Sequence, residues 1–214
     1  AEKILGISSG VDLAYYDPTV PLAPPFDAAL PTYTFVGTMD YPPNVDAVEW
    51  FATGILPLIR KRLPNAQFYV VGSSPTPAVA ALAKIDGVHV TGRVADVRPY
   101  LKYAKACVAP MRIARGIQNK VLQPMAMGVP TIVTPDALEG IEAEAGREVL
   151  LAADAASFAD ASIKVVETDI GVAIGAAAHR RMVERYSWAA RLAGFDPLLG
   201  VASAQAPRAR NAAP

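Results

Sequence analysis

The sequence predicts an α/β fold with an open, doubly wound parallel sheet. Two observations lead to this fold class. Short apolar segments alternate with longer helical segments, and 52% of the 214 residues are hydrophobic although only 7% are aromatic. Strands that alternate with helices become parallel strands joined by right-handed crossovers, and small apolar side chains suit helices packed on both faces of such a sheet. The length allows one domain of this kind and is short for two.

The regular pattern lies between two segments of different composition. Residues 1–33 follow neither a helical nor an alternating period, and five prolines fall within them (Pro18, Pro21, Pro24, Pro25 and Pro31). We therefore expect an extended interdomain or linker segment there. Residues 201–214 are rich in Ala, Pro and Arg and are expected to be a disordered tail. The domain itself is expected at residues 34–200.

Six strands are expected in the domain, each a short apolar run. They are at residues 34–37, 67–72, 88–91, 106–109, 131–133 and 148–151. Seven helices are expected at residues 44–62, 77–84, 96–105, 118–128, 155–167, 171–186 and 188–199. Pro57 should kink the first helix. Pro77 behind Thr76 suits the first turn of the second helix, and Asp96 should cap the third.

The loops after the strands of a parallel sheet meet at one edge, and ligands of open sheets bind there. Gly37, Gly92 and Gly116 fall in these loops. Glycine lets a backbone approach a ligand closely. We therefore expect the binding site at this edge.

The segment Arg115–Pro130 is the most informative part of the sequence for function. A helix begins near Gln118 and ends at Gly128, where a C-terminal glycine belongs. The basic, glycine-containing turn before it aims unpaired N–H groups and the positive end of a helix dipole at one point, which predicts a site for phosphate. Lys120 adds a point charge. The alternatives are a solvated loop side chain for Arg115 and, for Lys120, a lysine that opposes the dipole unless an anion is bound.

Composition and charge argue against several classes of function. Twenty basic side chains balance twenty acidic ones, so no global field attracts nucleic acid or an anionic membrane. Cys107 is the only cysteine, which excludes an internal disulfide, and we expect it to be a small buried hydrophobe. His89 and His179 have no carboxylate at ligand spacing, so no metal site is expected. Without a long apolar run or a signal-peptide pattern, we expect a soluble, cytoplasmic protein.

Three segments, read in order, carry a resemblance to a known family. They are Gly10–Pro18, the strand ending at Val36-Gly37, and Leu122–Pro130. They resemble the C-terminal, donor-binding half of GT-B glycosyltransferases, a Rossmann-like domain, over roughly residues 10–199. The resemblance is to the bacterial glycosyl transferases of group 1 that use nucleotide sugars with retention of configuration. Within that group, Arg115–Met127 is similar to the branch associated with exopolysaccharide clusters.

The resemblance implies roles for residues at the predicted edge. The family has a Glu-x7-Glu pattern in which the second Glu holds the ribose hydroxyls and the first faces the sugar and diphosphate. These positions are Gln123 and Arg115 in this sequence. A neutral Gln123 should hold ribose more weakly, and Arg115 suits phosphate rather than sugar hydroxyls. The backbone at Gly116, Ile117 and Gln118 is implied to face the diphosphate.

Relatives also carry an Arg and a Lys shortly after the first strand, where they neutralise the diphosphate. Here Thr38 follows Gly37, and Pro42-Pro43-Asn44 occupies the region of the Lys, so both charges are missing. We expect Arg115 and Lys120 to replace them as the groups that stabilise the departing diphosphate, with Gly37 and Thr38 beside the phosphates.

The nucleobase is implied to rest against the loop that contains Arg93 and Val94. No metal and no cofactor are expected, because fixed protein charges would act on the diphosphate. The cluster Arg60-Lys61-Arg62 at a helix end is expected to be structural, since it complements the helix dipole. Gly72-Ser73-Ser74 is read as a turn, although such a cluster could also cradle phosphate.

Enzymes of this family have two Rossmann-like halves, and this sequence resembles only the donor half. The expected partners are a nucleotide-sugar donor and a missing N-terminal acceptor domain, so the isolated chain should not transfer sugar. A peripheral membrane contact of the parent enzyme stays open. Two alternatives also stay open: half of a nucleotide-sugar epimerase, which would need acidic residues across the cleft, and a non-catalytic nucleotide-binding or scaffold module, which the lost carboxylates at positions 115 and 123 would suit.

Overall fold

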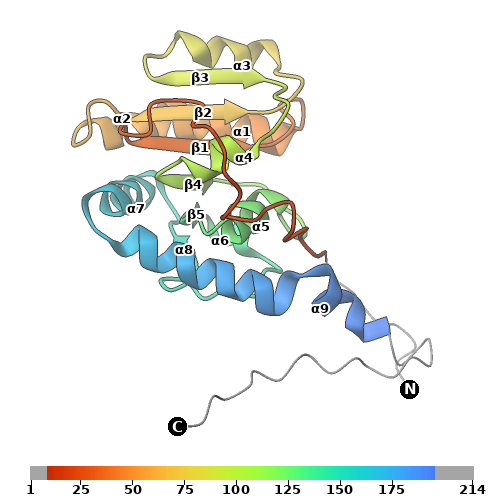
Figure 1. The fold of residues 1–214 in the computed structure, drawn as a ribbon. Coiled ribbons are helices and arrows are strands. Elements are labelled where there is room, and N and C mark those ends of the chain that lie inside the picture. Colours follow the sequence, from red (N-terminus) through yellow and green to blue (C-terminus); the bar gives the residue numbers. More distant parts are fainter. Residues whose placement is uncertain (1–8, 196–214) are drawn as a thin grey trace.

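The computed structural model describes residues 9–195 and arranges them around a parallel sheet of six strands (Figure 1). The strands are β1 (Thr32–Val36), β2 (Gln67–Val71), β3 (Val88–Gly92), β4 (Ala106–Ala109), β5 (Thr131–Val133) and β6 (Leu150–Leu151). Their order is β3-β2-β1-β4-β5-β6, and every neighbouring pair is parallel. The predicted open, doubly wound α/β fold is confirmed. The order changes direction between β1 and β4.

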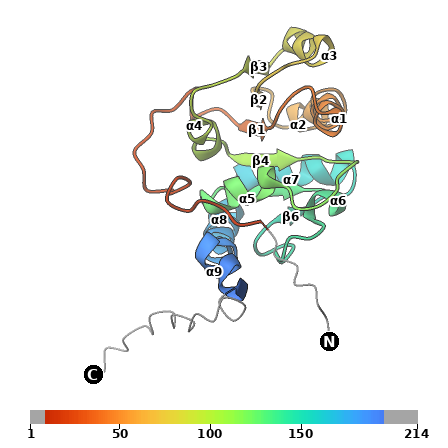
Figure 2. The same ribbon diagram turned by 90° about the vertical axis from the view of Figure 1, so that its right-hand side faces the viewer.

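Helices cover both faces of this sheet (Figure 2). One face carries α1 (Pro42–Trp50), α2 (Leu56–Arg60), α3 (Pro77–Ala81) and α7 (Ala155–Glu167), which packs against α2. The other carries α4 (Arg98–Lys102), α5 (Asn119–Ala126) and α8 (Ile170–Arg181). Two further short helices are α6 (Pro135–Leu138) and α9 (Trp188–Leu192). Irregular helical turns follow four of the helices, at Phe51–Ile55, Leu82–Lys84, Met182–Tyr186 and Ala193–Phe195.

Aromatic side chains fill the core between β1, β2 and the helices of the first face. Tyr33, Phe51, Phe68 and Phe158 are fully buried. The rings of Phe51 and Phe68 lie 4.3 Å apart, and the Tyr33 hydroxyl donates to the Ser162 carbonyl at 2.8 Å. Burial of large rings is the main stabilising term in such a core. This packing therefore holds β1 and the helices of the first face in a defined position, and with them the loop that follows β1.

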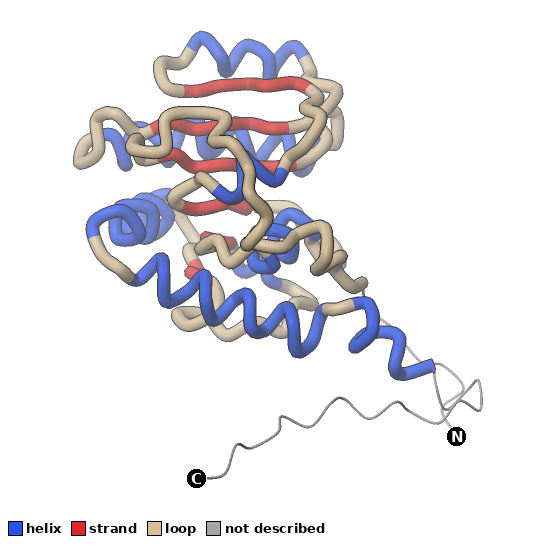
Figure 3. The backbone as a smooth tube through the Cα atoms, in the orientation of Figure 1, coloured by secondary structure: helices blue, strands red, loops and turns tan. Residues whose placement is uncertain are grey.

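Residues 9–31 cross the second face of the sheet without regular helix or strand (Figure 3). The Lys102 ammonium donates to the Val20 carbonyl at 2.6 Å, and the ring of Phe26 lies 4.7 Å from that of Tyr69. An isolated bridge joins Val11 to Ser187, just before α9. The described part of the predicted linker is thus held on the domain, while residues 1–8 and the predicted tail lie outside the described residues.

Several predicted strand and helix bounds need correction. Strand β1 begins two residues earlier than predicted because Thr32 pairs with Gln67. The sixth strand keeps only Leu150–Leu151, because it pairs with only two residues of the three-residue β5. The first helix begins at Pro42 rather than at 44, since proline suits the first helical positions.

Helix α4 begins later and ends earlier than predicted. Its N-cap is Val97, so the prediction that Asp96 caps it was wrong. The Asp96 carboxylate instead accepts from the backbone N–H of Arg98 at 2.9 Å and pairs with the Arg98 guanidinium at 2.8 Å. Helix α6 was not predicted at all. It is only four residues long, too short for a helical period to show in the sequence. Thr134 caps it by accepting from the Ala137 N–H.

The backbones of the loops after β1 and β2 touch each other. A Cβ built on Gly72, whose φ is +153°, would lie 1.6 Å from the Gly37 carbonyl oxygen. The Gly37 N–H also donates to the Val71 carbonyl at 3.0 Å. Only glycine at position 72 allows this approach, which holds the two loops together at the carboxyl edge of the sheet.

A pair of substitutions tests this contact. Gly72→Ala and Gly92→Ala both place a side chain at positive φ, but a Cβ on Gly92 would meet nothing within 4 Å. We expect Gly72→Ala to lower the free energy of unfolding by about 2 kcal/mol more than Gly92→Ala, because of the added clash. Urea unfolding of both variants measures the difference. Equal losses would contradict the close approach of the two loops.

Candidate functional site

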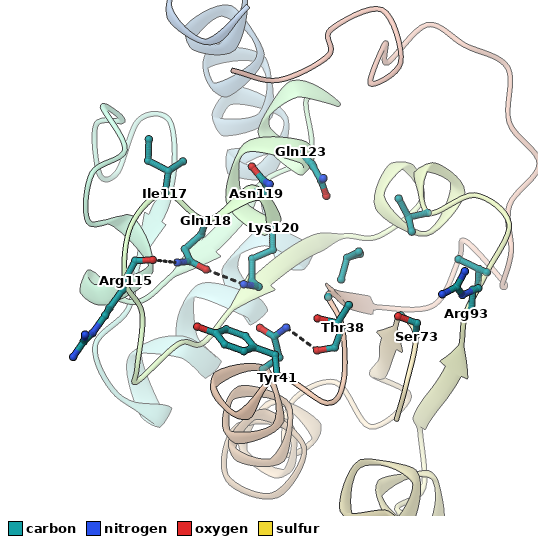
Figure 4. A pocket seen from close by; sticks show the side chains of 16 residues that line it. Thr38, Tyr41, Ser73, Arg93, Arg115, Ile117, Gln118, Asn119, Lys120 and Gln123 are labelled. Carbon is teal, nitrogen blue, oxygen red and sulfur yellow. Dashed lines mark hydrogen bonds between the residues drawn. The ribbon is translucent and has the colours of Figure 1, made fainter. Parts of the chain in front are cut away.

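A pocket of about 670 Å³ opens at the carboxyl edge of the sheet, beside the ends of β1 and β4 (Figure 4). The loops after β1, β2 and β3 and the start of α5 form its wall. The lining residues are Val36, Gly37, Thr38, Tyr41, Asn44, Gly72, Ser73, Arg93, Val94, Val97, Arg115, Ile117, Gln118, Asn119, Lys120 and Gln123. Open α/β sheets bind ligands at the point where the strand order changes direction, which is where this pocket lies.

The structure brings nine of the ten predicted site residues to this pocket. They are Gly37, Thr38, Arg93, Val94, Arg115, Ile117, Gln118, Lys120 and Gln123. The tenth, Gly116, lies in the same loop with φ +67°, where glycine is favoured, and does not line the pocket. A shared location does not assign roles, so the predicted contacts to phosphate, ribose and base stay predictions.

Lys120 places a cation inside the pocket (Figure 4). Its ammonium donates to Gln118 Oε1 at 2.8 Å and lies 5.8 Å from the centre of the Phe35 ring. Burial lowers the pKa of Lys120 from 10.5 to about 8, because the charged form loses contact with water. Lys120 is therefore still protonated at pH 7, although its charged form is less favourable than that of a lysine in water.

The backbone at the start of α5 carries donors without a partner in the described chain, and residues 117–120 line the pocket. Gln118 is the N-cap, but its side chain does not cap the helix. Its carbonyl accepts from the N–H groups of Val121 and Leu122. Within residues 9–195, no acceptor is present for the backbone N–H groups of residues 116–120. Open N–H groups and the helix dipole both favour an anion here.

Arg115 reaches the pocket with its backbone rather than its charge. Figure 4 shows its guanidinium pointing away from Lys120 and Thr38. Its side chain is exposed, and no carboxylate of the described chain pairs with it. The predicted contact between Arg115 and a diphosphate therefore requires this long side chain to turn.

The charge of the pocket differs from that of the whole chain. The chain has no net charge, yet Arg93 and Lys120 line the pocket, Arg115 lines it with its guanidinium turned away (Figure 4), and among described residues no Asp or Glu lines it. Such a site favours an anionic ligand through local charge alone.

Sequence reasoning missed three polar residues of the pocket, Tyr41, Asn44 and Asn119, and read a fourth, Ser73, as part of a turn that could also cradle phosphate. Asn44 is 3% exposed, and its Nδ2 donates to the Thr38 carbonyl at 2.8 Å, whereas its Oδ1 has no partner among the described atoms. A Cβ on Gly37 would lie 2.7 Å from Asn44 Nδ2, so glycine at 37 leaves room for this amide. Tyr41 is the N-cap of α1 and Asn44 lies in its first turn, and this position after β1 was the available signal.

Other predicted features lie away from the pocket. Cys107 is buried, as expected, and burial raises the pKa of its thiol. Arg60 and Arg62 of the basic cluster pair with Asp86 and Glu167. Over the described range, His, Cys, Asp and Glu residues form no group of three or more that could hold a metal ion. None of the described helices is both long and apolar enough to span a membrane.

The fold is a Rossmann-like domain with a pocket at its topological switch point that is lined by basic residues and by no described carboxylate. The chain belongs to the glycosyl transferases group 1 family, whose family model matches residues 30–168. No curated protein matches the sequence.

Solved structures share the fold at low sequence identity. A glycosyltransferase from Rickettsia africae has a TM-score of 0.72 and 19% identity, with 92% of this chain and 57% of that chain covered. HepE from Anabaena, in complex with UDP and glucose, has a TM-score of 0.71 and 13% identity, with 91% and 56% covered. The C-terminal domain of the group 1 protein LpcC from Francisella tularensis has a TM-score of 0.64 and 15% identity, with 84% and 100% covered. This chain thus spans just over half of the first two proteins.

The partly buried Lys120 ammonium should lower the stability of the ligand-free protein relative to a variant with an uncharged side chain at this position. We expect Lys120→Met to raise the free energy of unfolding at pH 7 by about 1 kcal/mol, because a partly buried charge without a counterion is removed. Between pH 8 and 10.5 the unfolded chain binds more protons at Lys120 than the folded chain does. Wild-type stability should therefore rise relative to the variant across this window.

Urea unfolding at pH 7 and pH 10 measures both effects. Lys61→Met is the matched control, because Lys61 is exposed at the end of α2 and should show neither effect. A Lys120→Met protein less stable than wild type at pH 7 would contradict this account of Lys120.

Proposed function

We propose that this chain is the donor-binding half of a retaining glycosyltransferase, and that its pocket holds the diphosphate of a nucleotide sugar. The observation that carries the proposal is the partly buried Lys120 ammonium beside the unpartnered N–H groups at the start of α5, in a pocket without a described carboxylate. A diphosphate supplies the negative charge and the acceptor oxygens that these groups lack. The Anabaena neighbour of the same fold was solved with UDP, which supports a nucleoside diphosphate as ligand.

The proposed chemistry of this half is stabilisation of the leaving group. The acceptor hydroxyl oxygen bonds to the anomeric carbon while the bond from that carbon to the phosphate oxygen breaks, and the departing diphosphate oxygen takes the proton of the hydroxyl. Negative charge then grows on the departing diphosphate. Lys120 and the N–H groups at residues 116–120 would stabilise that charge, and Arg115 would join them once its side chain turns. Fixed charges of this kind need no metal ion.

The remaining donor contacts follow from the pocket's shape. Gln123 lies on α5, one turn beyond Lys120, and we assign it the ribose hydroxyls. Arg93 and Val94 follow β3 on the far side of the pocket, and we assign them the nucleobase. Gly37 and Thr38 lie between these two groups in the strand order, beside the expected phosphates.

The parent enzyme would need a second half. The chain covers 57% of the Rickettsia glycosyltransferase and the whole of an isolated C-terminal domain from Francisella. We propose that an acceptor-binding domain lies across the pocket in the parent, and that the parent transfers a hexose in exopolysaccharide or surface-glycan synthesis on the cytoplasmic side. The chain by itself should bind donor without transferring sugar.

Calorimetric titration of the chain with UDP and with GDP tests donor binding. We expect at least one of them to bind at pH 7, and Lys120→Met to weaken that binding about tenfold or more, since a charge-assisted contact is lost. The dissociation constant should also rise about tenfold from pH 7 to pH 9 as Lys120 loses its proton.

Lys61→Met serves as the control and should bind like wild type. Arg115→Ala shows whether the guanidinium turns into the pocket, and we expect a smaller loss than for Lys120→Met. No heat with either nucleotide, or unchanged affinity in Lys120→Met, would contradict the proposal.

A further inference from the structure

The carboxamide of Gln118 joins two parts of the pocket wall (Figure 4). Its Nε2 donates to the carbonyls of Arg115 and Gly116 at 3.2 and 3.0 Å, and its Oε1 accepts from the Lys120 ammonium at 2.8 Å. The residue is 9% exposed. Carbonyls only accept and an ammonium only donates, so these partners fix which end of the amide faces which way.

These bonds give Gln118 a role different from direct ligand binding. Both of its N–H groups are used within the chain, as is one lone pair of its oxygen. Since the side chain points to the loop and to Lys120, it leaves the first N–H groups of α5 uncapped. The sequence had placed Gln118 among the residues that bind the ligand itself.

We propose that Gln118 is a positioning residue that aims the Lys120 ammonium into the pocket while leaving its charge unneutralised. This inference rests on the proposed function, in which Lys120 meets a diphosphate. A carboxylate in the same place would also hold Lys120, but it would cancel the charge that the ligand needs. A neutral amide oxygen takes one N–H of the ammonium and leaves two for an anion. The same amide fixes the Arg115–Gly116 backbone, so the site is preformed before binding.

The surroundings of Lys120 agree with this role. The charged or titratable residues that line the pocket with Lys120 are Tyr41 of the turn before α1, Arg93 after β3, and Arg115 of the loop before α5. A second amide, Asn44 of α1, is buried with its Oδ1 unpartnered within the described chain. The pocket wall thus holds amides and no described carboxylate, and Gln118→Glu would give this wall its first carboxylate among the residues described.

Two variants of the full chain test the proposal. Gln118→Glu keeps the size of the side chain and adds a charge, and Gln118→Met removes the polar atoms. Lys120 is titrated in the free protein by NMR of ¹³Cε-labelled lysine, with its signal identified by its loss in Lys120→Met. UDP affinity is measured by calorimetry at pH 7. The control is Gln67→Glu at the start of β2, at the opposite edge of the sheet.

In Gln118→Glu we expect the Lys120 midpoint to rise by about one pH unit or more, because an ion pair favours the charged form. UDP affinity should nevertheless fall about tenfold, because the new carboxylate neutralises the Lys120 ammonium that would meet the diphosphate. Gln118→Met should also lose about tenfold in affinity, since Lys120 is no longer aimed. Gln67→Glu should change neither quantity.

Wild-type UDP affinity in Gln118→Met would overturn the proposal. So would a fall in affinity in Gln118→Glu without a shift of the Lys120 midpoint, which would mark a merely structural role. If the wild-type chain binds no nucleotide, the proposed function fails. The Lys120 titration in the free protein still decides whether Gln118 holds this ammonium.

Discussion

The site depends on one unneutralised ammonium held partly out of water. Burying a charge without a counterion lowers the stability of a protein, and such charges are found at functional sites where a ligand supplies the opposite charge. In this chain a neutral amide oxygen from Gln118 and the face of the Phe35 ring lower the cost of burying Lys120 without cancelling its charge. With a carboxylate in place of either group, the pocket would be a satisfied ion pair with little attraction for an anion.

The fold delivers this ammonium to one point through its topology. The strand order changes direction between β1 and β4, so the loops after these strands separate and leave a crevice. Close backbone contact between Gly37 and Gly72 holds one wall of that crevice. The glycine-containing loop before α5 forms the other wall and ends in uncapped N–H groups. Core packing of β1 therefore bears directly on the geometry of the site.

The sequence predicted the sheet, most of its elements and the edge that carries the pocket, because these follow from periodicity and parallel topology. It also predicted Lys120 and the residues around it, although the resemblance to a family supplied most of their roles. It did not predict the contribution of Asn44 or the positioning role of Gln118, since both depend on how amides orient in three dimensions. The sequence also did not predict the direction of the Arg115 guanidinium or the start of α4. Both depend on which partners the side chains and the helix end find in the folded chain.

The most direct measurement is a ¹⁵N–¹H NMR titration of the labelled chain with UDP. The account predicts that the largest shifts fall on the backbone amides of residues 116–120, with smaller ones at Gly37 and Thr38. A second pocket lies at Met127, Gly128 and Gly171, near the opposite edge of the sheet. The largest shifts at that pocket, or no shifts at residues 116–120, would contradict a diphosphate site at the start of α5.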